Sequence, residues 1–299
     1  MAKILAVGDI HNHITQASVI IDKYIDTHKI VLCGDFYDDF GDSAVEADQT
    51  ARWLKDILKH DNVVALVGNH DVNYHYKNIK LGSVSAEQLY DCSGYSPAKD
   101  DTINRIMTNE DWDKIKFAHF ENGFWFSHAG FHPFWFSSPP YGMDNEIINI
   151  KLKKIQQDFD VRVYSHELCG AGKCRGGMNR VGGLLWRDQI RESYTGSYWN
   201  DSSGLKQVCG HTPVKSIDVE ETRNKGLCID IDCGLSQVLE ILEDGTYNII
   251  DTGLESFYKE SERKFAEQEK KAREEQRRKY LDISSWGSYD DIYNKLNKS

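Results

Sequence analysis

Five short segments of this chain carry Asp, His and Asn side chains in an order that could bind metal ions. They are residues 8–12 (Gly-Asp-Ile-His-Asn), 34–39 (Gly-Asp-Phe-Tyr-Asp-Asp), 68–71 (Gly-Asn-His-Asp), 127–130 (Ser-His-Ala-Gly) and 210–213 (Gly-His-Thr-Pro). One such segment could arise by chance, but each follows an apolar run, and the complete series is hard to obtain by accident. Carboxylates, imidazoles and an amide oxygen form a mixed ligand set, which indicates a site for two divalent metal ions.

The spacing suggests how these residues would divide between the two ions. Asp9 and His11 are two residues apart in an extended turn, so both can reach one ion, and Asp35 is placed to bridge it to the second. The ligands of the second ion would be completed by Asn69, His128 and His211. Two ions about 4 Å apart can lower the pKa of a bridging water and clamp a phosphate group, so the pattern predicts phosphoester hydrolysis.

Hydrolysis of a phosphate ester also needs an acid that protonates the leaving oxygen. His70 adjoins the ligand Asn69 but is free to turn toward the leaving group, which makes it the candidate general acid. Asp38 could orient the His70 ring and stabilise its charge.

Alternating strands and helices are predicted to position the first three segments. Apolar runs at 4–7, 29–33 and 63–67 indicate buried strands, and each is followed by one of the segments. Apolar residues recur at helical spacing over 15–27 and 44–59. This order implies parallel strands joined by right-handed crossovers. Because open α/β sheets gather their active sites beyond the carboxyl ends of the strands, we expect the three segments to meet there.

The pattern changes beyond residue 73, where a polar, mixed stretch runs to residue 115. The elements that we expect after it are a hairpin at 117–126, a helix at 145–158, a flexible Gly-rich loop at 165–183 and a closing hairpin at 226–242, around Asp232-Cys233-Gly234. From about Gly253 the chain is densely charged. We therefore predict a catalytic domain over 1–253 and a charged helical extension over 254–299, which either lies solvated on the domain or contacts a partner or second subunit.

Composition, charge and cysteine count are compatible with a metal-dependent hydrolase but do not by themselves indicate one. The 299 residues include 36 Lys plus Arg and 47 Asp plus Glu, and a net charge of −11 argues against tight nonspecific binding to nucleic acid. Seven cysteines without a dense framework favour a reducing compartment. The N-terminal apolar run is too short for a signal peptide core or a membrane span. We expect a soluble, cytoplasmic protein without membrane contact.

At the five segments the chain resembles the phosphoprotein-phosphatase branch of the calcineurin-like metallophosphoesterases. The signatures of that family are Gly-Asp-x-His-Gly, Gly-Asp-x-x-Asp-Arg-Gly, Gly-Asn-His-Glu/Asp, His-Gly/Ala-Gly and Gly-His-x-x. The resemblance covers roughly residues 2–242. Residues 184–188 (Leu-Leu-Trp-Arg-Asp) and 228–234 (Cys-Ile-Asp-Ile-Asp-Cys-Gly) are also similar to the compact bacterial and phage members, such as the bacteriophage lambda phosphatase and the symmetrical dinucleoside tetraphosphatases.

The resemblance implies an α/β fold of two mixed β-sheets packed between helices. It implies the metal ligands and acid pair already named, which are Asp9, His11, Asp35, Asn69, His128, His211, and His70 with Asp38. It also implies two divalent ions, with manganese preferred and iron or zinc as alternatives. The activity that follows is that of a phosphomonoesterase similar to the protein serine/threonine phosphatases.

The chain departs from the family signatures at two positions. Asn12 stands where glycine is usual, which we expect to change only the loop. Asp39 replaces the arginine that grips the phosphate in the family, and a carboxylate there would repel a phosphate dianion. Either another cation has taken over, or the substrate is a less negative diester or anhydride. The candidate substrate-binding cations are Arg187, Arg191, Arg180 and Arg175.

Three functions remain open on this evidence. The first is a phosphomonoesterase acting on phosphorylated proteins or small molecules, and the second is a hydrolase of nucleotide anhydrides or of RNA or nucleotide diesters. The third is a non-catalytic metal-containing binding protein. Retention of all six ligands and His70 speaks against the third, because a decayed site usually loses some of them.

Two further groups of residues have alternative interpretations. Cys169 with Cys174 and Cys228 with Cys233 could form a four-cysteine zinc site, although small core residues are the better prediction. A cluster of aromatic residues just after His128 could form a substrate wall or pack in the core, and its members are Phe131, Phe134, Trp135 and Phe136.

Overall fold

The computed structural model describes residues 2–75, 92–137, 143–160, 164–192, 204–221 and 226–259, together with 263, 267, 270, 271, 273 and 274. Contacts divide the chain into two units, Met1–Ser256 and Phe257–Ser299. The described residues of the second unit are helical. The first unit holds all five segments singled out above.

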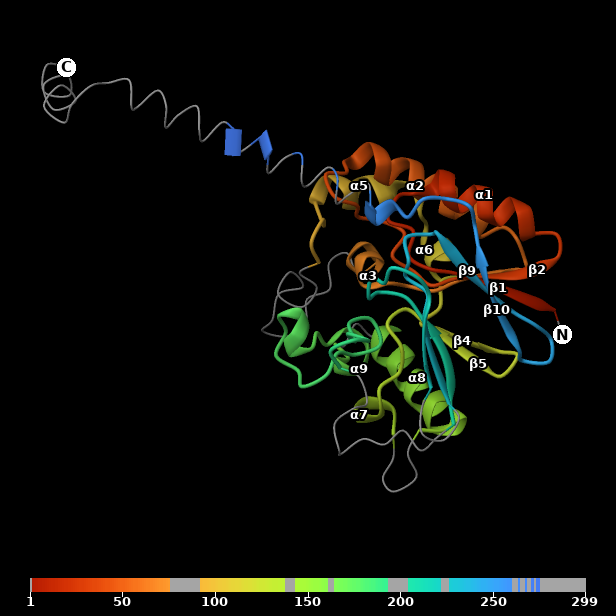
Figure 1. Ribbon diagram of the computed structural model, residues 1–299. Helices are drawn as coiled ribbons and strands as arrows, with labels where there is room; N and C mark the ends of the chain where they lie inside the picture. The colour runs from red at the N-terminus through yellow and green to blue at the C-terminus, as the bar shows by residue number, and fades with distance from the viewer. Residues whose placement is uncertain are drawn as a thin grey trace, which may run out of the picture. The chain divides into compact units, whose positions relative to one another are not determined.

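The first sheet of this unit has five strands in the order β10-β9-β1-β2-β3 (Figure 1). Its strands are β1 (Lys3–Val7), β2 (His28–Leu32), β3 (Val63–Ala65), β9 (Gln237–Ile241) and β10 (Tyr247–Asp251). β1, β2 and β3 are parallel as predicted, and β9 pairs antiparallel with both β1 and β10. The sheet is therefore mixed.

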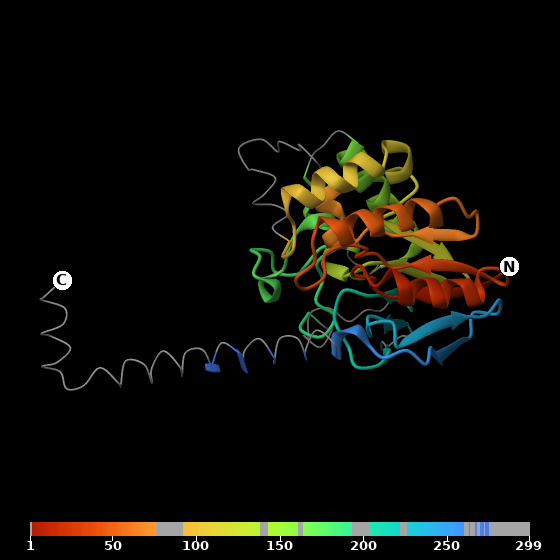
Figure 2. The same ribbon diagram turned by 90° about the horizontal axis from the view of Figure 1, so that it is seen from above.

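Helices cover the outer face of this sheet. α1 (Ile14–Tyr24) and α2 (Ala44–Ile57) are the predicted crossovers, and α2 starts with a capping box between Ser43 and Glu46 that satisfies its first backbone N–H groups. α3 (Asn69–His75), α5 (Pro97–Ile106) and α6 (Asn109–Trp112) follow β3. Figure 2 shows α1, α2 and α5 side by side in red, orange and yellow.

The second sheet has the order β4-β5-β6-β8-β7. Its strands are β4 (Ala118–Glu121), β5 (Phe124–Ser127), β6 (Lys206–Cys209), β7 (Asp218–Glu221) and β8 (Leu227–Asp230). β5, β6 and β8 are parallel, while β4 and β7 pair antiparallel at the two edges. The helices on this side are α7 (Pro133–Phe136), α8 (Asn145–Asp160), α9 (His166–Cys169) and the 3-10 turn Lys173–Arg175.

Two apolar clusters hold these layers together. The first joins the sheets face to face, since Ile4 and Val31 share it with Phe126 and Ile229. The second packs the helices after β5 against the other face of the second sheet, with Phe131 and Leu184 among its buried members. The predicted α/β architecture of two mixed sheets between helices is confirmed.

Two predictions about local structure are wrong. β8 and β9 do not form a closing hairpin over 226–242, because they belong to different sheets, and β9 pairs instead with β10 and β1. The apolar residues before the turn at 232–234 belong to the second sheet and those after it to the first, so the chain crosses from one sheet to the other. The segment 165–183 is not a featureless loop, because it contains α9 and the 3-10 turn, and Lys173 N donates to Asn179 O at 2.9 Å.

Across the described part of the chain, no helix is both long and apolar enough to cross a membrane.

Glycines allow the strand ends to approach one another closely. A Cβ added at Gly68 would lie 2.0 Å from Asp35 Oδ1 and 2.4 Å from Asp35 N. A Cβ added at Gly210 would lie 2.0 Å from Asp9 Oδ1. The segments can therefore meet only because these two positions have no side chain.

We predict that Gly68→Ala lowers the free energy of unfolding by about 3 kcal/mol, because the added methyl overpacks a buried backbone contact. The matched control is Gly123→Ala in the β4–β5 turn, where φ is +82° and nothing lies within 4 Å of the added Cβ. Its cost should be only the left-handed conformation of the new residue, about 1 kcal/mol. Urea denaturation in the presence of a chelator measures both, and equal losses would contradict the crowding argument.

Candidate metal centre

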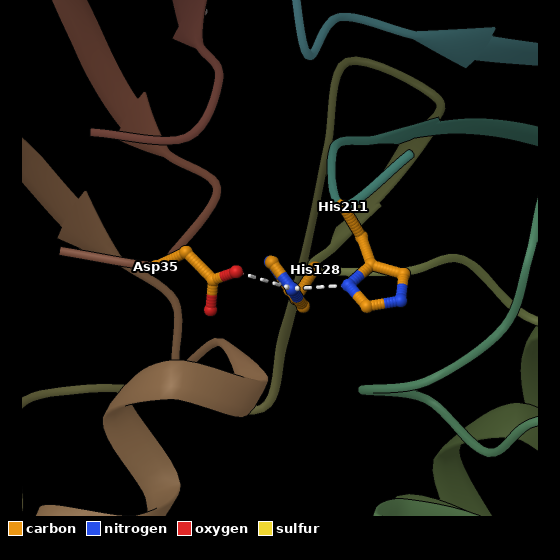
Figure 3. A group of neighbouring side chains, drawn as sticks. All are labelled: Asp35, His128 and His211. Atoms are coloured by element: carbon orange, nitrogen blue, oxygen red, sulfur yellow. Dashed lines mark hydrogen bonds and ion pairs between the residues drawn. The ribbon is translucent and has the colours of Figure 1, made fainter. Parts of the chain in front are cut away.

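The predicted ligands converge from both sheets. Asp9 and Asp35 follow β1 and β2, and Asn69 is the first residue of α3. His128 follows β5 and His211 follows β6, so the second sheet supplies imidazoles to the carboxylates of the first. Figure 3 shows Asp35, His128 and His211 pointing toward one another across this junction.

The donor atoms fall into two groups that share Asp35. One consists of Asp9, His11 and Asp35, and the other of Asp35, His128 and His211, with all donor atoms of a group within 4.8 Å of one another. Asp35 Oδ2 lies 3.8 Å from His11 Nε2 and 3.4 Å from His128 Nε2. Asp35 is therefore common to both groups, and its Oδ2 faces an imidazole nitrogen of each.

Asn69 also reaches the second group. Its Oδ1 lies 2.9 Å from His128 Nε2, which is in turn 3.1 Å from His211 Nδ1. The Asn69 amide is oriented by its own Nδ2, which donates to Cys92 Sγ at 3.1 Å. The sequence does not predict this role of Cys92, because a lone cysteine in a polar stretch has no partner at ligand spacing.

Backbone carbonyls fix the tautomers of two of the imidazoles. His11 Nδ1 lies 2.7 Å from Asp38 O, and His128 Nδ1 lies 2.8 Å from Cys33 O. Since a carbonyl can only accept, Nδ1 donates in both rings, and Nε2 presents its lone pair to the centre when the ring is neutral. A partner that orients the far nitrogen in this way is typical of metal-binding histidines.

The charges of the buried groups suit a cation. Burial, with Asp232 and Asp35 nearby, raises the pKa of Asp9 well above its usual value. Burial and the neighbouring His128 lower the pKa of His211 well below its usual value, so its ring stays neutral. Burial opposes protonation of His128, yet Asp35 raises the pKa of that ring. The carboxylate oxygens and imidazole nitrogens thus surround a buried region that favours positive charge. These residues fit two divalent ions.

His70 lies beside the two donor groups, and its Nδ1 is 3.1 Å from Asp38 Oδ2. Its backbone N donates to Asp35 Oδ1 at 2.9 Å, so the residue is tied to the bridging carboxylate. Burial opposes its protonation, but Asp35 and Asp38 raise the pKa of His70 well above its usual value. The two residues predicted as an acid pair are thus in contact.

The two departures from the family signatures have partners within the first unit. Asp39 Oδ2 lies 3.2 Å from His13 Nε2, and Asp39 Oδ1 accepts from Phe40 N at 2.7 Å. Although burial opposes its ionisation, these contacts hold the pKa of Asp39 below its usual value, so it is a carboxylate at neutral pH. Asn12 has φ +63° and donates to Asp42 Oδ2 at 2.8 Å, so it does more than change the loop.

The four candidate arginines differ in their surroundings. Arg175 is the one tied to the metal centre, since its Nη2 donates to Thr212 Oγ1 at 3.0 Å and its charge lowers the pKa of His211. Arg187 is fully buried and its Nη1 donates to Phe131 O at 3.1 Å. Arg180 and Arg191 are exposed, and Arg191 Nη1 donates to Cys174 O.

The structure bears on the two alternative interpretations, the four-cysteine zinc site and the aromatic substrate wall. Among the described residues, which include all seven cysteines, the two groups of donors able to hold a metal contain no cysteine. Phe131 and Phe136 are buried in the second apolar cluster, and Trp135 packs against it. Core packing therefore accounts for most of the aromatic cluster.

Comparison with known proteins identifies the family. Residues 2–170 match the sequence model of the calcineurin-like phosphoesterases, and the chain belongs to that family. It is therefore a metal-dependent phosphoesterase, and the family's dinuclear site has its candidate ligands in the two donor groups above. No curated protein matched the chain significantly.

Similar solved structures include phosphatases of several kinds. The cold-active protein-tyrosine phosphatase of the psychrophile Shewanella sp. is 17% identical, with 84% of this chain and 81% of that chain covered and a TM-score of 0.47. A protein serine/threonine phosphatase from Saccharomyces cerevisiae is 15% identical, with 85% and 81% covered and a TM-score of 0.45. A putative diadenosine tetraphosphatase is 14% identical, with 84% and 93% covered and a TM-score of 0.40.

We predict that isothermal titration with Mn²⁺ finds two bound ions in the wild-type protein. Asp35→Asn should weaken both binding events, because both donor groups lose their shared oxygen, whereas His11→Ala and His211→Ala should each remove one event. Each Mn²⁺ site, at about 100 times its dissociation constant, should raise the free energy of unfolding by about 2.7 kcal/mol. If His11→Ala and His211→Ala removed the same event, the division into two groups would be wrong.

Proposed function

We propose that the protein is a di-metal phosphomonoesterase that acts on phosphorylated proteins or small molecules, similar to the protein serine/threonine phosphatases. The observation that carries this proposal is the Asp35 carboxylate, whose Oδ2 faces both His11 Nε2 and His128 Nε2 within 3.8 Å. One oxygen that serves two donor groups fits two ions about 4 Å apart. In this proposal the ligands are Asp9, His11, Asp35, Asn69, His128 and His211.

Manganese is the proposed cofactor, with iron or zinc as alternatives, since carboxylate and imidazole ligands suit each of them. The bound ions would activate a water for attack on phosphorus and neutralise the phosphoryl oxygens. The chain's own part is to hold the ligands in place. Backbone carbonyls fix the imidazoles of His11 and His128, and His211 N donates to Asp9 Oδ2 at 3.1 Å.

His70 is the proposed general acid. Its Nδ1 is held by Asp38, so Nε2 is the ring nitrogen that would carry the transferred proton. When the bond between phosphorus and the leaving oxygen breaks, the oxygen keeps the electron pair and takes that proton. The carboxylates of Asp35 and Asp38 support this role, because they raise the pKa of His70 well above its usual value.

Asp39 favours a second candidate function. It occupies the place of the family arginine as an ionised carboxylate paired with His13. A negative group there opposes a phosphate dianion more strongly than a monoanion. A nucleotide anhydride or an RNA or nucleotide diester is therefore the alternative substrate. Family membership gives no support to the third possibility, a non-catalytic binding protein.

The proposed function predicts Mn²⁺-dependent hydrolysis of an aryl phosphate monoester, abolished by a chelator. His70→Asn should lower kcat by about 100-fold or more, because it removes the acid while leaving the metal ligands in place. Phosphate release from phenyl phosphate, whose poor leaving group needs the acid, measures this loss, and colorimetric assays on 4-nitrophenyl phosphate and bis-4-nitrophenyl phosphate compare the monoester with the diester. Turnover of the diester alone would support the alternative, and no turnover of either ester with Mn²⁺ bound would refute both.

A second prediction concerns the lost arginine. Asp39→Arg should raise kcat/KM for the monoester about tenfold relative to the diester, since a charge-assisted hydrogen bond to the phosphate is worth about 1.5–3 kcal/mol. Asp39→Asn is the control, which removes the repulsion without adding a cation and should give a smaller gain. An unchanged ratio in both variants would show that position 39 does not contact the substrate.

A further inference from the structure

A buried lysine lies against the carboxylate that holds His70. Lys99, in α5, is 3% exposed, and its Nζ lies 2.7 Å from Asp38 Oδ1 and 2.8 Å from Asp42 Oδ1. Burying an ammonium group costs several kcal/mol unless it is well paired. Two buried carboxylates pair it here, so the position of the Lys99 charge is sharply defined.

Both oxygens of Asp38 are engaged in this arrangement. Oδ2 faces His70 Nδ1, while Oδ1 accepts from Tyr74 Oη at 2.5 Å and from Lys99 Nζ. Rotating the carboxylate would break three contacts at once. The orientation of the His70 ring is therefore set by groups on the opposite side of Asp38.

The contacts continue to Asn12. Asp42 binds Lys99 through Oδ1 and accepts from Asn12 Nδ2 through Oδ2, and Asn12 Oδ1 accepts from Thr50 Oγ1 at 2.7 Å. The residue that replaces the family glycine thus fixes the second partner of Lys99. This gives Asn12 a role that a glycine could not perform, because a glycine has no amide to donate.

We propose that Lys99 is a positioning residue for the general acid, because it holds the Asp38 carboxylate in the plane that His70 needs. Tyr74 assists by donating to the same Asp38 oxygen, and Asp42 assists by pairing with the Lys99 ammonium group. This inference rests on the proposed role of His70. The hydrogen bonds of Lys99 Nζ go to Asp38 and Asp42, which belong to neither donor group, so its effect should be confined to protonation of the leaving oxygen.

The leaving group of the substrate separates this role from a structural one. Phenyl phosphate depends on an acid much more than 4-nitrophenyl phosphate, because phenolate is the poorer leaving group. Lys99→Met should lower kcat for phenyl phosphate by about 10- to 100-fold, with a clearly smaller loss for 4-nitrophenyl phosphate and an unchanged KM. Tyr74→Phe, which removes a partner of the same oxygen, should show the same selectivity to a smaller degree, and Lys99→Arg should restore part of the loss.

Lys55→Met is the matched control. Lys55 pairs with Asp111 at 2.8 Å and joins α2 to the α5–α6 region without touching Asp38. This variant should lower the melting temperature while leaving the ratio of the two substrates unchanged. An equal loss on both substrates in Lys99→Met and in Tyr74→Phe would overturn the inference.

A double variant makes the test independent of overall stability. In a His70→Asn background, Lys99→Met should cost no further activity, because the acid that Lys99 serves is already absent. A full additional loss would overturn the positioning role. If the wild-type protein shows no activity, the proposed function fails and this inference with it. If His70→Asn shows the leaving-group selectivity and Lys99→Met does not, the inference alone fails.

Discussion

The Asp35 carboxylate, buried where the two sheets meet, is the group on which the rest of the centre depends. Its Oδ2 faces His128 from the second sheet and His11 from the first, and its Oδ1 accepts from His70 N. A carboxylate removed from water is costly unless positive charge or hydrogen-bond donors surround it. The packing of the sheets creates this cost, and imidazoles and backbone donors offset it, as bound cations would. Fold and chemistry are therefore coupled at one residue.

Close approach of backbone segments is the second requirement of the centre. Several of its residues adopt left-handed backbone angles, with φ of +45° at His11, +49° at Asp35, +66° at Asp38 and +72° at His211. Such angles are unfavourable for residues other than glycine and persist only when the surroundings enforce them. Here the glycines at 68 and 210 admit the neighbouring carboxylates, and the hydrogen bonds of the turns hold the strained residues. The free energy gained by burying the apolar core offsets the cost of these strained backbone angles.

The sequence was sufficient for the parts of the site that are local. Each ligand follows an apolar run, and because parallel strands end at one edge, Asp9, Asp35 and Asn69 could be placed together before the structure was known. Lys99 could not be predicted in this way, since it lies 61 residues from Asp38 in a polar stretch without periodicity. The sequence also did not predict the burial of Arg187, or that the chain crosses from the second sheet to the first between β8 and β9. These depend on tertiary packing, which leaves no short-range pattern.

The position of β9 between β1 and β10 has a consequence for how the protein is made. Ile4 of β1 pairs with Ile241 of β9, so one side of the first strand has no neighbour until almost the whole domain has been synthesised. At about 5–20 residues per second the nascent chain waits roughly 10–50 s for that strand. During this time an apolar strand with an open edge invites pairing with other chains. The first strand therefore remains open to such pairing until the C-terminal strands emerge.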